Sequence, residues 1–102
     1  MKPVVISMLG LISGVCLSMA GCHAEGKKVF QSNRCPECHT INGKGGSAAP
    51  NLSNVGSRRT PEFIRQQIRD SKINYPNTNM PSFKNLSDKD MNALVDYLSS
   101  LK

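Results

Sequence analysis

The five residues Cys35–Pro36–Glu37–Cys38–His39 constrain this chain more than any other stretch. They form the pattern C-x-x-C-H, in which three scarce residue types stand at fixed positions. The spacing suits covalent attachment of a c-type haem, because two thiols separated by two residues can add to the two vinyl groups on one porphyrin edge. The histidine that follows is then held under the iron as its proximal ligand. The motif therefore predicts one haem c, attached through Cys35 and Cys38, with His39 on the iron.

A Cys-x-x-Cys pair has other uses than haem attachment. A closed zinc site needs four ligands, yet no cysteine lies beyond Cys38 and no histidine beyond His39. A thioredoxin-like redox pair belongs in a βαβ pattern that this chain lacks. A structural disulfide between Cys35 and Cys38 leaves His39 unexplained. A non-haem thiol or zinc protein is therefore the weaker hypothesis. It would be supported if the purified protein were colourless, without haem absorption bands.

The length of the chain allows one small domain. It has 102 residues, and only 38% of them are A, V, I, L, M, F, W, Y or C, which is too little to build a large core unaided. A flat apolar macrocycle would fill the centre of a small helical shell. Removal of residues 1–21 takes away one basic residue and leaves 12 basic and 7 acidic residues, or +5. This charge suits an acidic partner, while an exported chain without clustered basic residues is not expected to bind nucleic acid.

Residues 1–21 have the form of a signal peptide of the lipoprotein type. A positively charged start, Met1–Lys2–Pro3, precedes an uncharged run from Val4 to Ala20. The run is short for a transmembrane helix, and an uncleaved anchor is the alternative. Its end, Met19–Ala20–Gly21–Cys22, is similar to a bacterial lipoprotein box, in which small residues precede a cysteine that becomes lipidated.

Lipidation would make Cys22 the first residue of the mature protein. Several acyl chains anchor firmly, because each buried methylene adds about 0.8 kcal/mol. Ordinary cleavage after Ala20 or Ala24, with soluble release, is the alternative. We expect a tether at 22–25, in which His23 is exposed rather than a second axial ligand, and a haem-binding domain at 26–102. Because His23 rather than aspartate follows Cys22, we expect a periplasm-facing lipoprotein of the outer rather than the inner membrane.

Three segments carry helix signals. The first runs from Gly26 to about Asn33 and leads into Cys35. The second begins at Thr60–Pro61–Glu62, with an N-cap hydroxyl, proline at the first helical position and an acid in the first turn, and runs to about Asp70. The third is capped by Ser87 and carries an apolar stripe. The stripe consists of Met91, Leu94, Val95, Leu98 and Leu101.

The segments between these helices have loop compositions. Residues 42–47 indicate a flexible omega-type loop, and residues 71–86 an irregular chain. Together the signals predict an all-α domain of three or more helices around one covalently attached haem.

Two methionines beyond the signal are candidates for the second axial ligand. Met91 belongs to the apolar stripe of the last helix, so core packing explains it. Met80 stands in a loop, where no periodic face explains it, and Pro81 stiffens the backbone after it. We therefore expect His39 and Met80 to ligate the iron. Two protein ligands leave no open position, which favours electron exchange over substrate binding.

From about residue 25 to the end, the whole pattern resembles a class I monohaem c-type cytochrome. The resemblance rests on the Gly26/Phe30 helix, Cys35–His39, Pro50–Asn51–Leu52, Met80–Pro81 and an aromatic-bearing last helix. Within the family the chain is similar to small photosynthetic-type cytochromes and to outer-membrane lipoprotein monohaem cytochromes of metal-reducing bacteria.

The resemblance implies several roles. It implies that Gly26 lets the first helix cross the last one closely near Tyr97, and that the carbonyl of Pro50 accepts a hydrogen bond from His39 and so orients it. The chain has no tryptophan, so the haem propionates need other partners. Four residues are candidates, namely Arg58, Arg59, Lys72 and Tyr75.

The predicted function is one-electron transfer outside the inner membrane by a lipid-anchored monomer, not an enzyme. Its expected partners are other redox proteins, either multihaem cytochromes or a respiratory complex, docking at the thioether edge, and the membrane through the lipid on Cys22. A haem peroxidase or gas-binding site is the alternative if Met80 does not ligate the iron. A further alternative is an anchored assembly subunit whose haem is mainly structural.

Overall fold

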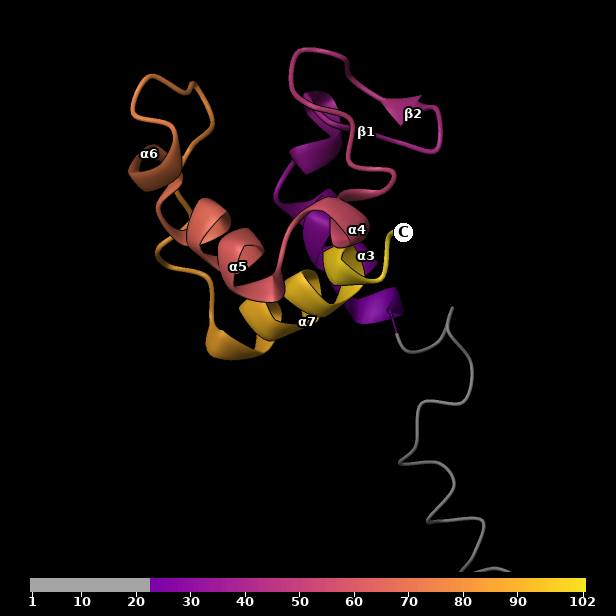
Figure 1. Cartoon of the computed structure of the whole chain (residues 1–102). Helices are drawn as coiled ribbons and strands as arrows, with labels where there is room; N and C mark the ends of the chain where they lie inside the picture. The colour runs from indigo at the N-terminus through magenta and orange to yellow at the C-terminus, as the bar shows by residue number, and fades with distance from the viewer. Residues whose placement is uncertain (1–22) are drawn as a thin grey trace, which may run out of the picture.

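The computed structural model describes residues 23–102, so the predicted signal segment 1–21 and the predicted lipidation site Cys22 lie outside the described residues. Two groups of elements stand above the last helix, α7, one formed by α5 and α6 and the other by the short strands (Figure 1). None of the described helices combines the length and apolarity that crossing a bilayer requires. In chain order the elements are α3 (Ala24–Ser32), η1 (Cys35–Glu37), β1 (Thr40–Ile41), β2 (Lys44–Gly45), α4 (Val55–Arg58), α5 (Pro61–Arg69), α6 (Ser71–Asn74) and α7 (Asp88–Ser99).

The helices α3 and α7 cross closely, and Gly26 stands at the crossing. A Cβ at this position would collide with the carbonyl oxygen of Ala93 and with the Cβ of Tyr97. One turn further along α3, the ring of Phe30 meets the ring of Tyr97 edge-on, with 6.1 Å between centroids. The close crossing expected from the sequence is therefore confirmed, and it fixes where α3 delivers the chain into Cys35.

The predicted starts of two helices are confirmed. The hydroxyl oxygen of Thr60 accepts a hydrogen bond from the backbone N–H of Phe63 at 3.1 Å, and α5 begins at Pro61. The hydroxyl oxygen of Ser87 accepts from the N–H of Asp90 at 3.1 Å, and α7 follows. Each cap satisfies an N–H group that the helix itself leaves without a partner.

The core of the described residues is small and centred on α7, which supplies four of its side chains. Met91 is 1% exposed, so core packing accounts for it as expected. The core consists of Val29, Phe30, Val55, Ile64, Ile68, Met91, Leu94, Val95 and Leu98. Eight further apolar side chains are only half-buried against this core, namely Cys35, Ile41, Leu52, Met80, Phe83, Leu86, Tyr97 and Leu101.

Two segments with loop compositions contain regular structure. The prediction of a flexible loop at 42–47 is wrong, because β1 and β2 pair antiparallel across a two-residue turn, with Thr40 opposite Gly45. Asn42 and Gly43 form that turn at φ 52° and 81°, and Asn-Gly is the usual sequence of such a turn. The second segment, predicted to be irregular, begins with the single-turn helix α6. The mostly helical fold class stands with this hairpin added.

His23 differs from the expected exposed tether residue. The helix α3 begins at Ala24, two residues before the expected domain boundary, and His23 precedes it as a half-buried residue. A nine-residue helix spans about 13 Å, so α3 separates His23 from the attachment segment that begins at Cys35. This placement removes the support for His23 as an axial ligand.

Candidate haem site

The attachment segment forms one tight turn. The N–H of Cys38 donates to the carbonyl of Cys35 at 3.2 Å, and the N–H of His39 donates to the same carbonyl at 3.0 Å. Arg34 precedes the turn at φ 64°, a left-handed conformation that ends α3 and redirects the chain. Both cysteines are free thiols, with Cys35 half-buried and Cys38 exposed. The local hydrogen bonds thus hold the two sulfur-bearing residues and the histidine in one unit.

The thiol of Cys35 fits poorly with a thioredoxin-like redox pair. Burial raises its pKa to about 11, outweighing the lowering by a backbone hydrogen bond, so the thiol stays protonated at neutral pH. A protonated thiol is a poor nucleophile for disulfide exchange. Within residues 23–102, no group of three histidine, cysteine or acidic side chains is placed to hold a metal ion.

The imidazole of His39 is held by the loop that follows the hairpin. Its Nδ1 lies 2.8 Å from the carbonyl oxygen of Pro50. With Nδ1–H donating to this carbonyl, the lone pair of Nε2 is left for a metal ion. The loop itself is tied back, because the N–H of Leu52 donates to the carbonyl of Thr40 at 2.8 Å.

Two glycines of the hairpin let it lie against the attachment segment. A Cβ on Gly45, whose φ is +118°, would collide with the carbonyl oxygen of His39, and one on Gly46 with that of Glu37. The N–H of Gly46 also donates to the carbonyl of Pro36 at 2.8 Å. These glycines are not among the predicted site residues, although the adjacent Gly-Gly pair is a signal of close backbone approach.

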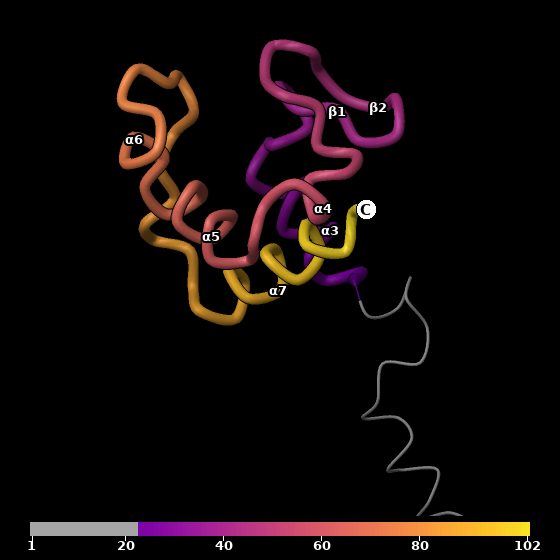
Figure 2. Tube along the Cα trace, in the orientation of Figure 1, coloured from indigo at the N-terminus to yellow at the C-terminus, as the bar shows by residue number. Residues whose placement is uncertain are grey.

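Met80 comes from the opposite group of elements. Figure 2 shows its segment, in orange, and the attachment and hairpin segments, in violet and magenta, rising on two sides above α7. The hydroxyl of Ser71 donates to the carbonyl of Met80 at 2.6 Å, and the N–H of Met80 donates to the hydroxyl of Thr78 at 3.1 Å. The amide Nε2 of Gln67 lies 3.5 Å from the sulfur of Met80.

Two of these distal contacts are not predicted by the sequence. Ser71 is 0% exposed and is the one buried polar residue of the described chain, so its hydroxyl is committed to holding the loop. Gln67 is half-buried on α5. Neither has a sequence signal of its own, because each partner lies nine or more residues away and meets it only in the folded chain.

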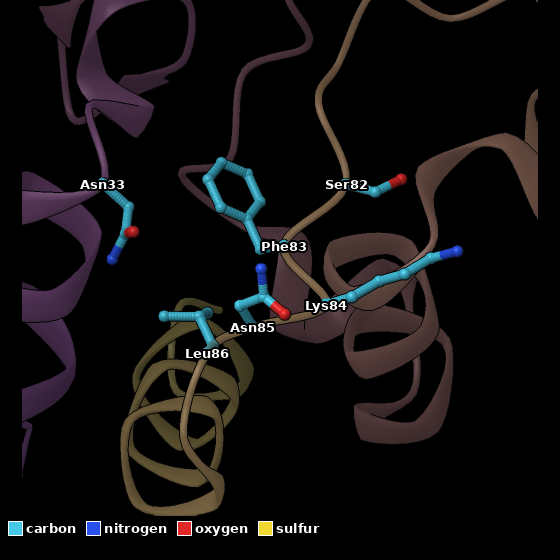
Figure 3. A pocket seen from close by; sticks show the side chains of 6 residues that line it. All are labelled: Asn33, Ser82, Phe83, Lys84, Asn85 and Leu86. Carbon is cyan, nitrogen blue, oxygen red and sulfur yellow. The ribbon is translucent and has the colours of Figure 1, made fainter.

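A hollow of about 480 Å³ lies between the end of α3 and the segment 82–86. The side chains of Phe83 and Leu86 point toward Asn33 across it, whereas Ser82 and Lys84 point away (Figure 3). Its volume falls within the range of small-molecule sites, roughly 300–1,000 Å³. The segment after Met80 thus turns an apolar side inward.

The four candidate propionate partners are engaged with protein atoms. The guanidinium of Arg59 lies 4.3 Å from the ring centroid of Phe63 and donates to the hydroxyl of Tyr75 at 3.1 Å. Arg58 donates to the carbonyl of Asn51 at 2.8 Å, and Lys72 to that of Thr78 at 3.0 Å.

The residues present fit a covalently held haem. Two free thiols could attach the group, an oriented imidazole and a half-buried thioether could ligate its iron, and the half-buried apolar side chains offer surface that a flat macrocycle would cover. The small core explains why a haem is needed. Nine buried side chains stabilise a domain of this size only weakly unless a disulfide, a metal ion or a cofactor adds to them. Fold and site together define a monohaem c-type cytochrome.

The chain belongs to the cytochrome c family, whose model, described as Cytochrome c, matches residues 23–102. Haem c is the covalent cofactor of this family, and Cys35 and Cys38 supply the two thiols. The chain is 35% identical to cytochrome c oxidase subunit 2 of Alkalihalophilus pseudofirmus, over 76% of this chain and 25% of that protein. It is 32% identical to a nitric oxide reductase subunit of Halomonas halodenitrificans, over 72% of this chain and 54% of that protein. The chain thus spans from a quarter to about half the length of these curated relatives.

Solved structures share the fold. The crystal structure of SoxXA from P. pantotrophus superimposes with a TM-score of 0.69 at 21% identity, over 78% of this chain and 80% of the other. The crystal structure of the c-type cytochrome SorU from Sinorhizobium meliloti superimposes with a TM-score of 0.62 at 22% identity, over 79% and 91%. The predicted mostly helical cytochrome c fold is therefore confirmed.

Proposed function

We propose that this cytochrome is a one-electron carrier whose iron has His39 and Met80 as its axial ligands. The observation that carries the proposal is the 2.8 Å hydrogen bond between His39 Nδ1 and the carbonyl of Pro50, which leaves Nε2 for the iron. Haem, once attached, supplies an iron that gains and loses one electron. A soft neutral thioether donates weakly and stabilises the ferrous state.

The protein's part in this function is to hold the two ligands still. Pro50 fixes the ring of His39, and Ser71 and Thr78 fix the backbone on either side of the Met80 peptide. Ligands that stay in place in both redox states keep the reorganisation energy small. Because both axial positions are filled by the protein, we expect no peroxidase activity and no ready gas binding.

The proposed partners are other redox proteins, either multihaem cytochromes or a respiratory complex. This proposal is supported by the relatives, which are named as subunits of cytochrome c oxidase and of nitric oxide reductase. The contact is expected to be small and transient, at the edge where Cys38 is exposed. The charge of +5 after residue 21 would steer an acidic surface toward it.

The ligation is tested by optical spectroscopy of the mature holoprotein, oxidised and reduced. Ferric protein with a methionine ligand shows a weak near-infrared sulfur-to-iron band. We expect this band in the wild type and in Met91→Leu, and its loss in Met80→Leu. The two variants make the same change of side chain at a core position and at the ligand position, and Leu for Met costs less than about 1.5 kcal/mol in a core.

Two outcomes contradict the proposal. A wild type without the near-infrared band, whose reduced form binds carbon monoxide readily, is a gas-binding or peroxidase-type haem protein instead. A band that survives in Met80→Leu and vanishes in Met91→Leu reverses the assignment of the two methionines.

We further propose that the protein is exported and lipid-anchored through Cys22, facing the periplasm from the outer membrane. Support comes from the sequence Met19–Ala20–Gly21–Cys22. Mass spectrometry of the mature N-terminus checks this directly, and Cys22→Ser should release a soluble haem protein. An unmodified N-terminus after Ala20 or Ala24 excludes the anchor but leaves the electron-carrier proposal untouched.

A further inference from the structure

The helix α3 begins directly beside the proposed lipid anchor. The carbonyl of His23 accepts a hydrogen bond from the N–H of Lys27 at 3.0 Å, so His23 already belongs to the first turn of α3. His23 is half-buried, and its Nδ1 is shielded from solvent. Neighbouring Cα atoms lie about 3.8 Å apart. No linker residue therefore separates a lipidated Cys22 from the folded domain.

The helix α3 has two distinct faces. Gly26, Val29 and Phe30 are buried against the domain. Four residues at i, i+3, i+4 and i+7 form an exposed face on the opposite side, which we call the lysine face. It consists of Ala24, Lys27, Lys28 and Gln31. Its two cations form no ion pair within residues 23–102, and Glu25, the acidic residue of α3, stands to one side of this face.

We propose that the lysine face of α3 rests on the anionic headgroups of the membrane that holds the lipid anchor, so that the domain has one orientation there. The proposal rests on lipidation of Cys22 as proposed above. The acyl chains supply the binding strength, and each lysine beside an anionic surface adds roughly a fivefold factor. Because the anchor already holds the start of α3 at the bilayer, the two charges act on the orientation of the domain rather than on whether it binds.

The packing of the helices determines which part of the domain then faces away from the membrane. The buried face of α3 packs on α7, and α7 packs in turn on α5. In Figure 1, α5 and α6 lie on the far side of the molecule from the first turn of α3. With the lysine face on the membrane, α7 lies above α3, and the segment that carries Met80 is directed away from the bilayer.

The experiment uses the mature lipidated holoprotein in vesicles of phosphatidylcholine alone and in vesicles that also contain phosphatidylglycerol. Lysines are acetylated briefly, and the extent at each residue is read by mass spectrometry. Lys27 and Lys28 should react severalfold more slowly on the anionic vesicles. Lys84, beside Asp70 at the end of α5, and Lys89, on the first turn of α7, should react equally on both. At high salt, where the Debye length shrinks to about 3 Å, the protection should be lost.

A matched pair of double variants gives a second measurement. Lys27→Gln/Lys28→Gln and Lys84→Gln/Lys89→Gln remove the same charge from exposed positions, so both should fold. Haem quenches a fluorophore on lipid headgroups by energy transfer, to an extent that depends on its distance from the bilayer. This quenching should differ between the two kinds of vesicle in the wild type and in Lys84→Gln/Lys89→Gln. In Lys27→Gln/Lys28→Gln it should be the same on both.

Three outcomes would overturn the proposal. Equal acetylation of Lys27 and Lys28 on both kinds of vesicle, in protein whose acyl chains are confirmed by mass spectrometry, would remove the orientation while the anchor stands. Protection of Lys84 and Lys89 instead would place another face of the domain on the membrane. A mature N-terminus without acyl chains would overturn both the orientation and the anchor.

Discussion

The proximal side of the haem site, residues 35–52, is shaped mainly by bonds between backbone groups, whereas the distal side, residues 67–83, is shaped mainly by side chains. On the proximal side, Gly46 donates to the carbonyl of Pro36, and Ala49 donates to that of Cys38 at 3.0 Å. On the distal side, the hydroxyls of Ser71 and Thr78 bind the carbonyl and the N–H of Met80.

This difference decides which substitutions each side tolerates. Backbone bonds form with almost any side chain, so the proximal geometry depends on residue type at fewer positions, chiefly where a Cβ has no room, as at Gly45 and Gly46. A loop held by hydroxyl and amide groups depends on each of those residues. The distal side also has some backbone bonds, such as the one from the N–H of Phe83 to the carbonyl of Ile68 at 2.8 Å, which side-chain changes leave in place.

The largest expected effect is that of Gly45→Ala on the proximal side. Its φ of +118° suits glycine alone, and the added Cβ would collide with the carbonyl of His39. We expect the free energy of unfolding to fall by about 3 kcal/mol or more, the upper end for a single strained residue. Chemical denaturation of the holoprotein measures it.

Gly43→Ala is the matched control, because Gly43 also has a positive φ, +81°, but nothing lies within 4 Å of its Cβ position. Its cost should be the conformational one alone, about 1–2 kcal/mol. Equal losses at Gly43 and Gly45 would mean that the hairpin does not need its close contact with the attachment segment.

Ser71→Ala should have the next largest effect, on the distal side. It removes the 2.6 Å hydrogen bond to the carbonyl of Met80 and leaves that partly buried group without its partner. The expected loss is about 1–3 kcal/mol of unfolding free energy. The near-infrared band of ferric haem should disappear at a lower temperature than in the wild type, because the loop detaches before the domain unfolds.

Ser57→Ala is the corresponding control, since Ser57 is exposed on α4. It should change neither the stability nor the band. If Ser71→Ala lowers stability while the band melts together with the rest of the protein, then the distal loop is not an independently held unit.

The difference between backbone bonds on the proximal side and side-chain bonds on the distal side also explains which site residues can be predicted from the sequence. The proximal site is a motif of five consecutive residues, so its chemistry is visible without a structure. Met80 is proposed as the second axial ligand because the helical spacing of Met91 assigns that methionine to the core. Ser71 and Gln67 cannot be found in this way, because their roles exist only once α5 and α6 are folded beside the loop.

The elements of the fold also differ in how well the sequence predicts them. Long helices with caps, α5 and α7, are predicted with their first residues, because local hydrogen bonds at Thr60 and Ser87 determine where they begin. The single-turn helix α6 carries too few residues for a periodic signal. The hairpin does carry a signal, Asn42–Gly43, which the glycine-rich composition of residues 42–47 obscures.

Thr60→Ala and Ser87→Ala compare two capped helices: α5, which belongs to the distal side of the site, and α7, which belongs to the core. Each removes a cap from a helix and should cost about 1 kcal/mol. Thr60 caps α5, which carries Gln67 and leads to Ser71, so its loss should also lower the temperature at which the near-infrared band fades. Ser87 caps α7, which packs against α3, α4 and α5, and its loss should lower stability without a separate effect on the band. If the near-infrared band fades at the same temperature in both variants, then α5 supports the distal loop no more specifically than α7 does.

The smallest expected effect is that of Glu37→Gln, which tests whether an exposed ion pair in the attachment segment contributes to the proximal side. Glu37 pairs with Arg34 at 2.7 Å, and its hydrogen bond and charge raise the pKa of the guanidinium. The side chains are 78% exposed for Arg34 and 59% for Glu37, so water and salt screen the pair. The backbone bond from Glu37 N–H to the carbonyl of Arg34, at 3.1 Å, survives the change. Denaturation at low and high salt should therefore give the wild-type stability in both. A loss as large as that of Ser71→Ala would mean that the proximal side depends on side chains after all.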